Sequence, residues 1–113
     1  MTLLINNDKS RVCFSHIDTQ ISSYIKNGKD IDSIILELKN KISKFETMLE
    51  NISDSEPRYK FLMTHNLVCK KRISDFEFIM GIKQKNNFSK FNLEKLFSLI
   101  KFRDKLLNFT QSY

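Results

Sequence analysis

The side chains best suited to chemistry in this chain are two cysteines, Cys13 and Cys69, and two histidines, His16 and His65. Neither cysteine lies in a CxxC motif, and neither histidine has partners at the spacing of a zinc site or of a nucleophile with its base. We therefore expect free thiols, histidines that belong to helix surfaces or cores, and no metal site.

Carboxylates and glycines give no sign of catalysis either. Asp30 and Asp32 are separated by two positions, as are Asp75 and Glu77, so on a helix each pair points apart and forms no acid–base dyad. Neither GxxxxGK[ST] nor GxGxxG occurs, so no phosphate-binding loop is visible. The sequence thus predicts no catalytic residue, no cofactor and no enzyme, but a protein that binds through a long helical surface.

Apolar residues recur with an alternating spacing of four and three along the first half of the chain. Such spacing is typical of a helix that keeps one seam toward a partner helix. The seam comprises Phe14, Ile17, Ile21, Tyr24, Gly28, Ile31, Ile35, Leu38, Ile42, Phe45, Leu49 and Ile52. Because the phase is the same on both sides of Gly28, we expect one continuous helix over about residues 9–52, weakened at this glycine.

A turn is predicted at residues 53–56, where serines and an aspartate precede Pro57, a residue suited to the first turn of a helix. The four–three spacing then resumes, and its seam includes Cys69, Ile73, Phe76 and Met80. We expect a second helix over about residues 57–110, with a kink near 81–88, where Gly81 and polar residues interrupt the pattern.

These elements predict a single all-α domain over residues 1–113, folded as an elongated antiparallel two-helix coiled-coil hairpin roughly 60 Å long. In this hairpin Cys13 would face the region of residue 95, about 39 Å from Cys69 along the axis. The alternative is a compact three- or four-helix bundle with breaks at Gly28, at 53–57 and at 85–87.

Charge is divided unevenly along the chain. Residues 1–57 carry seven Lys or Arg and nine Asp or Glu, giving −2, whereas residues 58–113 carry twelve and four, giving +8. A basic half suits acidic protein surfaces, nucleic acid or anionic membranes, and residues 70–72 and 101–105 are its clearest clusters. No nucleic-acid-binding motif occurs, and no apolar run is long enough for membrane insertion.

Three segments resemble the FliJ/YscO/InvI stalk proteins of type III secretion. Residues 68–85 resemble the second helix of that family, reading VCKKRISDFEFIMGIKQK, with a basic cluster, Ile73, Asp75, a large apolar residue and Glu77. Residues 11–14 (RVCF) are similar to the start of its first helix, and residues 89–95 (SKFNLEK) to a later segment.

The resemblance implies an antiparallel coiled coil that inserts into the hexameric secretion ATPase and couples it to the cytoplasmic domain of the export gate. It also implies contact with secretion chaperones and a place in the cytoplasm, beside a membrane-embedded secretion apparatus. By this analogy Arg11, Lys101, Arg103 and Lys105 would contact the ATPase. Tyr59, Leu62 and Phe76 would contact the gate.

Two other functions remain open at this point. A helical regulatory interaction module, such as the N-terminal bundle of a SNARE, would use residues 31–52 and 57–80 as two of its helices. A basic hairpin that binds nucleic acid would show tight, salt-sensitive affinity for arbitrary DNA or RNA.

Overall fold

The structure is a computed structural model that describes residues 8–86 and 92–111 of the 113-residue chain. The described part is helical and contains no strand. Its four helices are α2 (Asp8–Lys26), α3 (Ile31–Glu50), α4 (Pro57–Asn86) and α5 (Leu93–Gln111). The all-α prediction is confirmed. The four helices fit the bundle that we considered as the alternative, and the two-helix hairpin is not confirmed.

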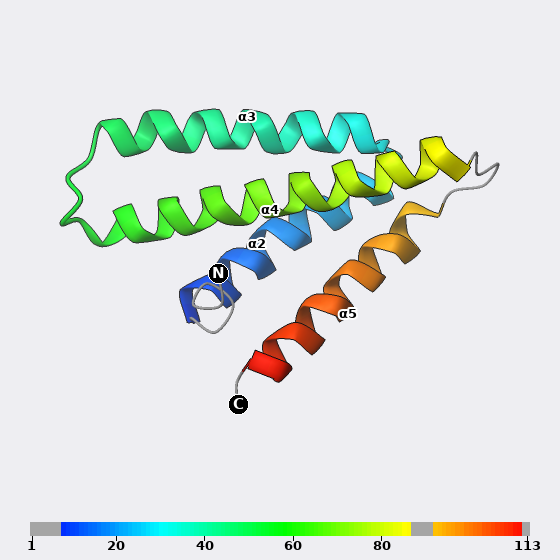
Figure 1. Cartoon of the computed structure of the whole chain (residues 1–113). Helices are drawn as coiled ribbons and strands as arrows, with labels where there is room; N and C mark the ends of the chain where they lie inside the picture. Colours follow the sequence, from blue (N-terminus) through cyan, green and yellow to red (C-terminus); the bar gives the residue numbers. More distant parts are fainter. Residues whose placement is uncertain (1–7, 87–91, 112–113) are drawn as a thin grey trace.

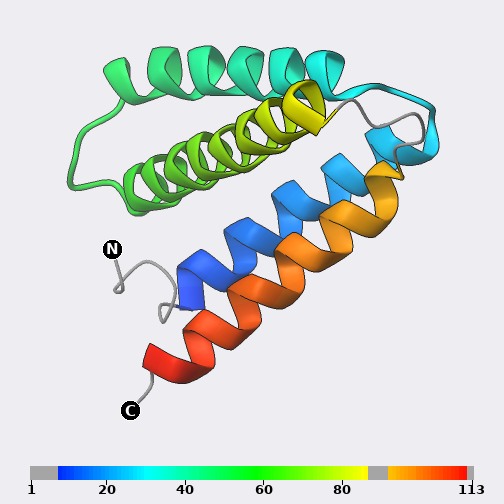
Figure 2. The same cartoon turned by 45° about the vertical axis from the view of Figure 1, so that its right-hand side comes forward.

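Helix α4 packs against α3 and α2, and the backbone of α5 lies closest to α2 (Figure 1). After the turn that follows α3, α4 runs back along α3. Helix α2 crosses α4, and α5 lies beside α2 (Figure 2). The beginning of α2 and the end of α5 lie at the same end of the molecule (Figures 1 and 2). The principal extents are 50 × 36 × 23 Å and the radius of gyration is 15.1 Å. A compact chain of this length is expected near 13 Å, so the shape is a moderately elongated bundle.

The link between α2 and α3 is an ordered reversal at Gly28, whose φ of 82° lies in the left-handed region that glycine adopts without penalty. The Gly28 amide donates to the carbonyl of Ile25 and the Lys29 amide to that of Tyr24, both at 3.0 Å. This pair of bonds is the Schellman arrangement that ends helices. Asp30 then caps α3, since its carboxylate accepts from the Ser33 amide at 2.9 Å.

The prediction of one continuous helix over residues 9–52 is therefore wrong. Residues 27–30 connect two helices, and this link has the length that places Ile31 where the four–three spacing would place it. Periodicity alone cannot distinguish such a link from a helical turn. The local sequence at Gly28 and Asp30 carried the stop and start signals.

The predicted turn at residues 53–56 is confirmed, because α3 ends at Glu50 and α4 begins at Pro57. The predicted second helix is two helices. Gly81 lies inside α4, which continues to Asn86, and the remainder of the predicted kink, residues 87–88, lies outside the described residues. Asn92 begins a new helix by accepting from the Lys95 amide at 3.0 Å.

The predicted seam residues face the interior, although they do not form a single seam. The buried ones are Ile17, Ile21, Ile31, Leu38, Cys69, Ile73 and Phe76. Those packed against them in partly buried positions are Phe14, Tyr24, Ile35, Ile42, Phe45 and Met80, and those half-buried near the 53–56 turn are Leu49 and Ile52. Because α2 and α3 both pack on α4, α4 presents more than one apolar side, and Val68 and Ile79 join its core face.

Candidate functional site

A buried arginine joins α2, α4 and α5. Arg72 is 1% exposed, and its Nε and Nη2 donate to the two carboxylate oxygens of Asp18 at 2.8 and 2.9 Å. Its Nη1 donates to Asp75 at 3.0 Å and to Asp104 at 2.6 Å. The guanidinium carbon also lies 4.9 Å from the ring centre of Phe14. Since bidentate, charge-assisted bonds are directional, they fix how α2 and α5 sit against α4.

Two more cations complete this group. Lys71 Nζ lies 3.1 Å from an oxygen of Asp75 and 3.1 Å from one of Asp104, and Arg103 Nη2 lies 3.0 Å from Asp75. The Arg72 cluster thus consists of Asp18, Lys71, Arg72, Asp75, Arg103 and Asp104. Its three cations and three carboxylates balance, so it carries no net charge. Within the basic tripeptide 70–72, only Lys70 is exposed.

The electrostatics of the cluster favour its charged state. Burial by itself would lower the pKa of Arg72, but the hydrogen bonds and charges of Asp18 and Asp104 outweigh burial and raise it. Burial would likewise raise the pKa of Asp104, but the charge and hydrogen bonds of Arg72, with those of Lys71, bring it below the ordinary value of 3.8. Both shifts favour the charged forms of Arg72 and Asp104.

A pocket of about 230 Å³ opens beside this cluster, between α2 and α5 and over part of α4. We call it the basic pocket, and its lining residues are Arg11, Phe14, Asp18, Lys71, Arg72, Lys101, Asp104 and Lys105. The Lys101 ammonium also lies 4.7 Å from the ring centre of Phe97. Five cations and two carboxylates line the pocket, a surplus of three positive charges.

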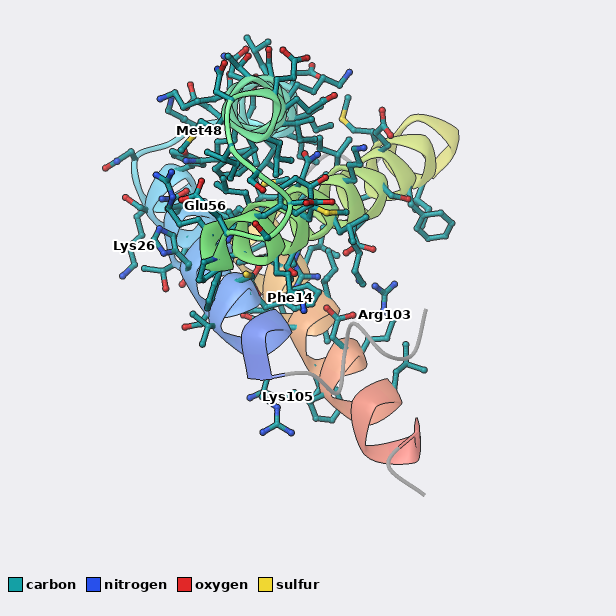
Figure 3. The ribbon with its side chains drawn as sticks, turned by 90° about the vertical axis from the view of Figure 1, so that its left-hand side faces the viewer. Phe14, Lys26, Met48, Glu56, Arg103 and Lys105 are labelled. Atoms are coloured by element: carbon teal, nitrogen blue, oxygen red, sulfur yellow. The ribbon has the colours of Figure 1, made fainter. Side chains whose placement is uncertain are left out.

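Three of the four residues predicted for ATPase contact meet at this pocket, namely Arg11, Lys101 and Lys105. Arg103, the fourth, lies on another side of α5 and is held by Asp75. Figure 3 shows Arg103 and Lys105 leaving α5 in different directions, with Phe14 between the helices. The family resemblance placed these residues in one set, and the fold divides them between two surfaces.

Cys13 and His65 are a thiol and an imidazole in direct contact, as in a catalytic cysteine–histidine pair, with 3.1 Å between Sγ and Nδ1. The same Nδ1 lies 2.9 Å from the Phe61 carbonyl oxygen, to which it can only donate. A ring nitrogen that donates its proton there cannot accept one from the thiol. Cys13 is also fully buried, and this burial raises its pKa to about 11. The pair therefore does not activate the thiol.

The two cysteines are closer in the fold than a hairpin would place them. Burial raises the pKa of Cys69 to about 11, and the nearby Cys13 contributes to this rise. Cys13 faces Phe61 and His65 on α4, so the predicted opposition to residue 95 is wrong. The bend at Gly28 causes this change because it turns α2 onto α4. Both thiols are free, as expected.

The residues predicted for export-gate contact do not form one surface. Phe76 is fully buried, with its ring centre 5.8 Å from that of Phe97, so it does not reach a partner from the folded state and this prediction is wrong. Leu62 lines a second pocket of about 270 Å³ between α2, α3 and α4, together with His16, Phe45 and His65. Tyr59 is half-buried.

Exposed large apolar side chains gather on α4 and α5. Of the twelve among the described residues, five lie on α4 and four on α5, while α2 and α3 together carry three. We call Leu67, Phe78, Leu99, Phe102 and Leu107 the α4–α5 face. Phe78 is 68% exposed and Leu99 57% exposed; their informative feature is that they lie together with other exposed apolar residues on two neighbouring helices.

Among the described residues no three His, Cys, Asp or Glu side chains are grouped to hold a metal ion. In the same part of the chain, none of the helices has the length and apolar character needed to span a membrane. No protein-family model, no curated protein and no solved structure matches this chain.

Proposed function

We propose that this chain is a non-enzymatic helical interaction module that binds an acidic amphipathic helix of a partner protein along the α4–α5 face. The main observation is that exposed apolar side chains are more numerous on α4 and α5 (nine) than on α2 and α3 (three), and that five of the nine make up the α4–α5 face. Exposed apolar groups that gather on one side of a protein mark a surface for another molecule.

The geometry of the face suits a helix. Asp75 of α4 pairs with Arg103 of α5 at 3.0 Å, and Phe78 is three residues beyond Asp75 while Leu99 is four residues before Arg103. The two helices run in opposite directions here, because Arg72 meets Asp104 and Phe76 meets Phe97. Phe78 and Leu99 therefore lie on one side of the ion pair.

Leu67 and Leu107 lie on the opposite side of the ion pair, where α4 and α5 diverge (Figure 1). Leu67 lies four residues before Lys71 on α4, and Leu107 lies four residues beyond Arg103 on α5. The face thus has apolar residues on both sides of an ion pair, and we propose that these residues contact the apolar side of a partner helix. Residues 58–113, which supply it, carry a net charge of +8, and this charge favours acidic residues along the edges of the partner helix.

A matched pair of variants tests this proposal. Leu99 and Leu36 are 57% and 58% exposed, but only Leu99 belongs to the α4–α5 face. The probe is an eighteen-residue fluorescent helical peptide with leucines on one side and glutamates at their edges. We expect Leu99→Asp to weaken its binding about tenfold, since roughly 1.4 kcal/mol of apolar contact is lost, and Leu36→Asp to leave it unchanged. Equal effects of the two substitutions, or equal affinity for a version of the peptide with lysines at the edges, would refute the proposal.

The secretion stalk is a second candidate, favoured by the pairing of the helices at the two ends of the described chain and by the meeting of Arg11, Lys101 and Lys105 at one pocket. Under this candidate the hexameric secretion ATPase, the export gate and secretion chaperones are the partners. Stimulation of the ATPase that depends on Arg11 and survives Leu99→Asp would favour the stalk over the α4–α5 face.

The remaining candidates are separated by simple measurements. A SNARE-type N-terminal bundle is one form of helical interaction module, and binding of the test peptide is also expected of it. Binding of arbitrary DNA that weakens steeply with salt would instead favour the basic nucleic-acid module.

A further inference from the structure

We propose that the basic pocket is a separate binding site and that it takes one acidic side chain of a partner segment, a glutamate beside an aromatic residue. The site lies on α2, α4 and α5, and it uses none of the residues of the α4–α5 face. The proposal goes beyond the function proposed above and does not depend on it.

The size of the pocket limits its occupant. Its volume of about 230 Å³ is below the roughly 300–1,000 Å³ of sites that hold drug-sized ligands or cofactors. A side chain or a small fragment fits such a space, whereas a nucleotide does not. The Phe14 ring and the carbon chains of Lys101 and Lys105 provide apolar walls, so the occupant carries an apolar body as well as a charge.

The charge of the pocket determines the sign of the occupant. Asp18 and Asp104 are already bound by Arg72, and Asp104 by Lys71 as well. Among the side chains that the structure describes, Arg11, Lys101 and Lys105 form no ion pair with a carboxylate. These three cations border one small space whose inner wall holds the buried guanidinium of Arg72. A carboxylate placed there meets cations that no described carboxylate neutralises.

A glutamate side chain is preferred over an inorganic anion because the pocket is largely apolar between its charged ends. Phosphate needs several donors around it, and Lys101 already lies over the ring of Phe97 at 4.7 Å, a position that suits a cation beside an apolar group. A carboxylate on a flexible stem, with an aromatic neighbour that contacts Phe14, satisfies both the charge and the apolar walls.

The test uses nuclear magnetic resonance titration of the full chain with four probes: the peptide acetyl-Ala-Phe-Glu-Ala-amide, the same peptide with Gln in place of Glu, 3-phenylpropionate and inorganic phosphate. We expect the Glu peptide and 3-phenylpropionate to shift the amide signals around Phe14 and Lys101. The Gln peptide is expected to bind at least tenfold more weakly, and phosphate to bind more weakly than either acid.

Charge-matched variants complete the test. The double variant Lys101→Gln with Lys105→Gln is expected to weaken Glu-peptide binding about tenfold. The double variant Lys44→Gln with Lys60→Gln removes the same charge from two exposed lysines elsewhere and is expected to leave binding unchanged. Any one of four results would overturn the proposal. These are equal binding of the Glu and Gln peptides, stronger binding of phosphate than of the acids, binding of 3-phenylpropionate but not of the Glu peptide, and equal effects of the two double variants. Leu99→Asp is expected not to change this binding, so failure here is distinct from failure of the α4–α5 face.

Discussion

The same substitution at the two glycines of this chain should have opposite effects on stability. Gly28 has a φ of 82° in the link between α2 and α3, whereas Gly81 lies inside α4. A Cβ atom added at either position meets nothing within 4 Å. The backbone conformation is therefore the main difference between the Gly28→Ala and Gly81→Ala variants.

The expected magnitudes follow from that conformation. An L-residue with a Cβ in the left-handed region costs roughly 1–2 kcal/mol, so Gly28→Ala should lower the free energy of unfolding by about 1 kcal/mol or more. Alanine inside a helix is better than glycine by roughly 0.5–1 kcal/mol, so Gly81→Ala should raise it. The two variants should differ by about 2 kcal/mol, or on the order of 8 °C in Tm for a domain of this size.

Urea unfolding monitored by circular dichroism measures both changes, and equal m-values would show that the unfolded states are comparable. Gly28→Asn serves as a control, because asparagine tolerates the left-handed conformation better than alanine and should lose less stability. If residues 9–52 formed one continuous helix, Gly28→Ala would stabilise the protein as Gly81→Ala does. That result would refute the bend and with it the bundle.

Three further outcomes are expected. Arg72→Met leaves Asp18 and Asp104 partly buried without their main counter-ion, and should lower the free energy of unfolding in urea by about 3 kcal/mol. The folded state lowers the pKa of Asp104, so this carboxylate stabilises the fold fully above its ordinary pKa of 3.8, and the stabilisation is lost as the pH falls through the pKa of the folded state. The free energy of unfolding measured from pH 6 to 2 should therefore fall less steeply in Asp104→Asn. With pKa values of about 11, Cys13 and Cys69 each have roughly one thiolate in a thousand at pH 8, so a thiol reagent should label them slowly in the native protein and rapidly in denaturant.

Much of the helical architecture could be predicted from the sequence. The apolar spacing identified interior residues such as Ile17 and Leu38 correctly, and the polar run before Pro57 located a turn. Both features depend on residues that are close together in the sequence, so the sequence alone is enough to identify them. The reversal at Gly28 was also encoded locally, by a glycine at the helix end and Asp30 as the next cap. A four-residue link preserves the phase of the apolar pattern, so the phase alone predicts a continuous helix where the capping residues indicate a break.

The Arg72 cluster could not be predicted in the same way. Asp18 lies 54 residues from Arg72 in the sequence and Asp104 lies 32 residues from it, so no spacing rule connects them. The sequence showed residues 70–72 as a basic run with a surface role. The three residues do not share one environment, because Arg72 points into the core while Lys70 points to solvent. A buried arginine of this kind is recognised only when its carboxylate partners are placed by the fold.

The way α5 is attached leaves both of the proposed binding surfaces on this one helix. Phe97 and Ile100 supply its buried apolar residues, and Asp104 ties it to Arg72. These three positions share one strip of the helix, so both flanks remain accessible, with Lys105 at the basic pocket and Leu99 on the α4–α5 face. Ion clusters of this type often select an arrangement more than they stabilise it. Asp104→Leu should therefore loosen α5 with little loss of total helicity and weaken both the Glu peptide and the amphipathic helix. Loss of one binding activity with full retention of the other would show that α5 does not carry the two surfaces as one unit.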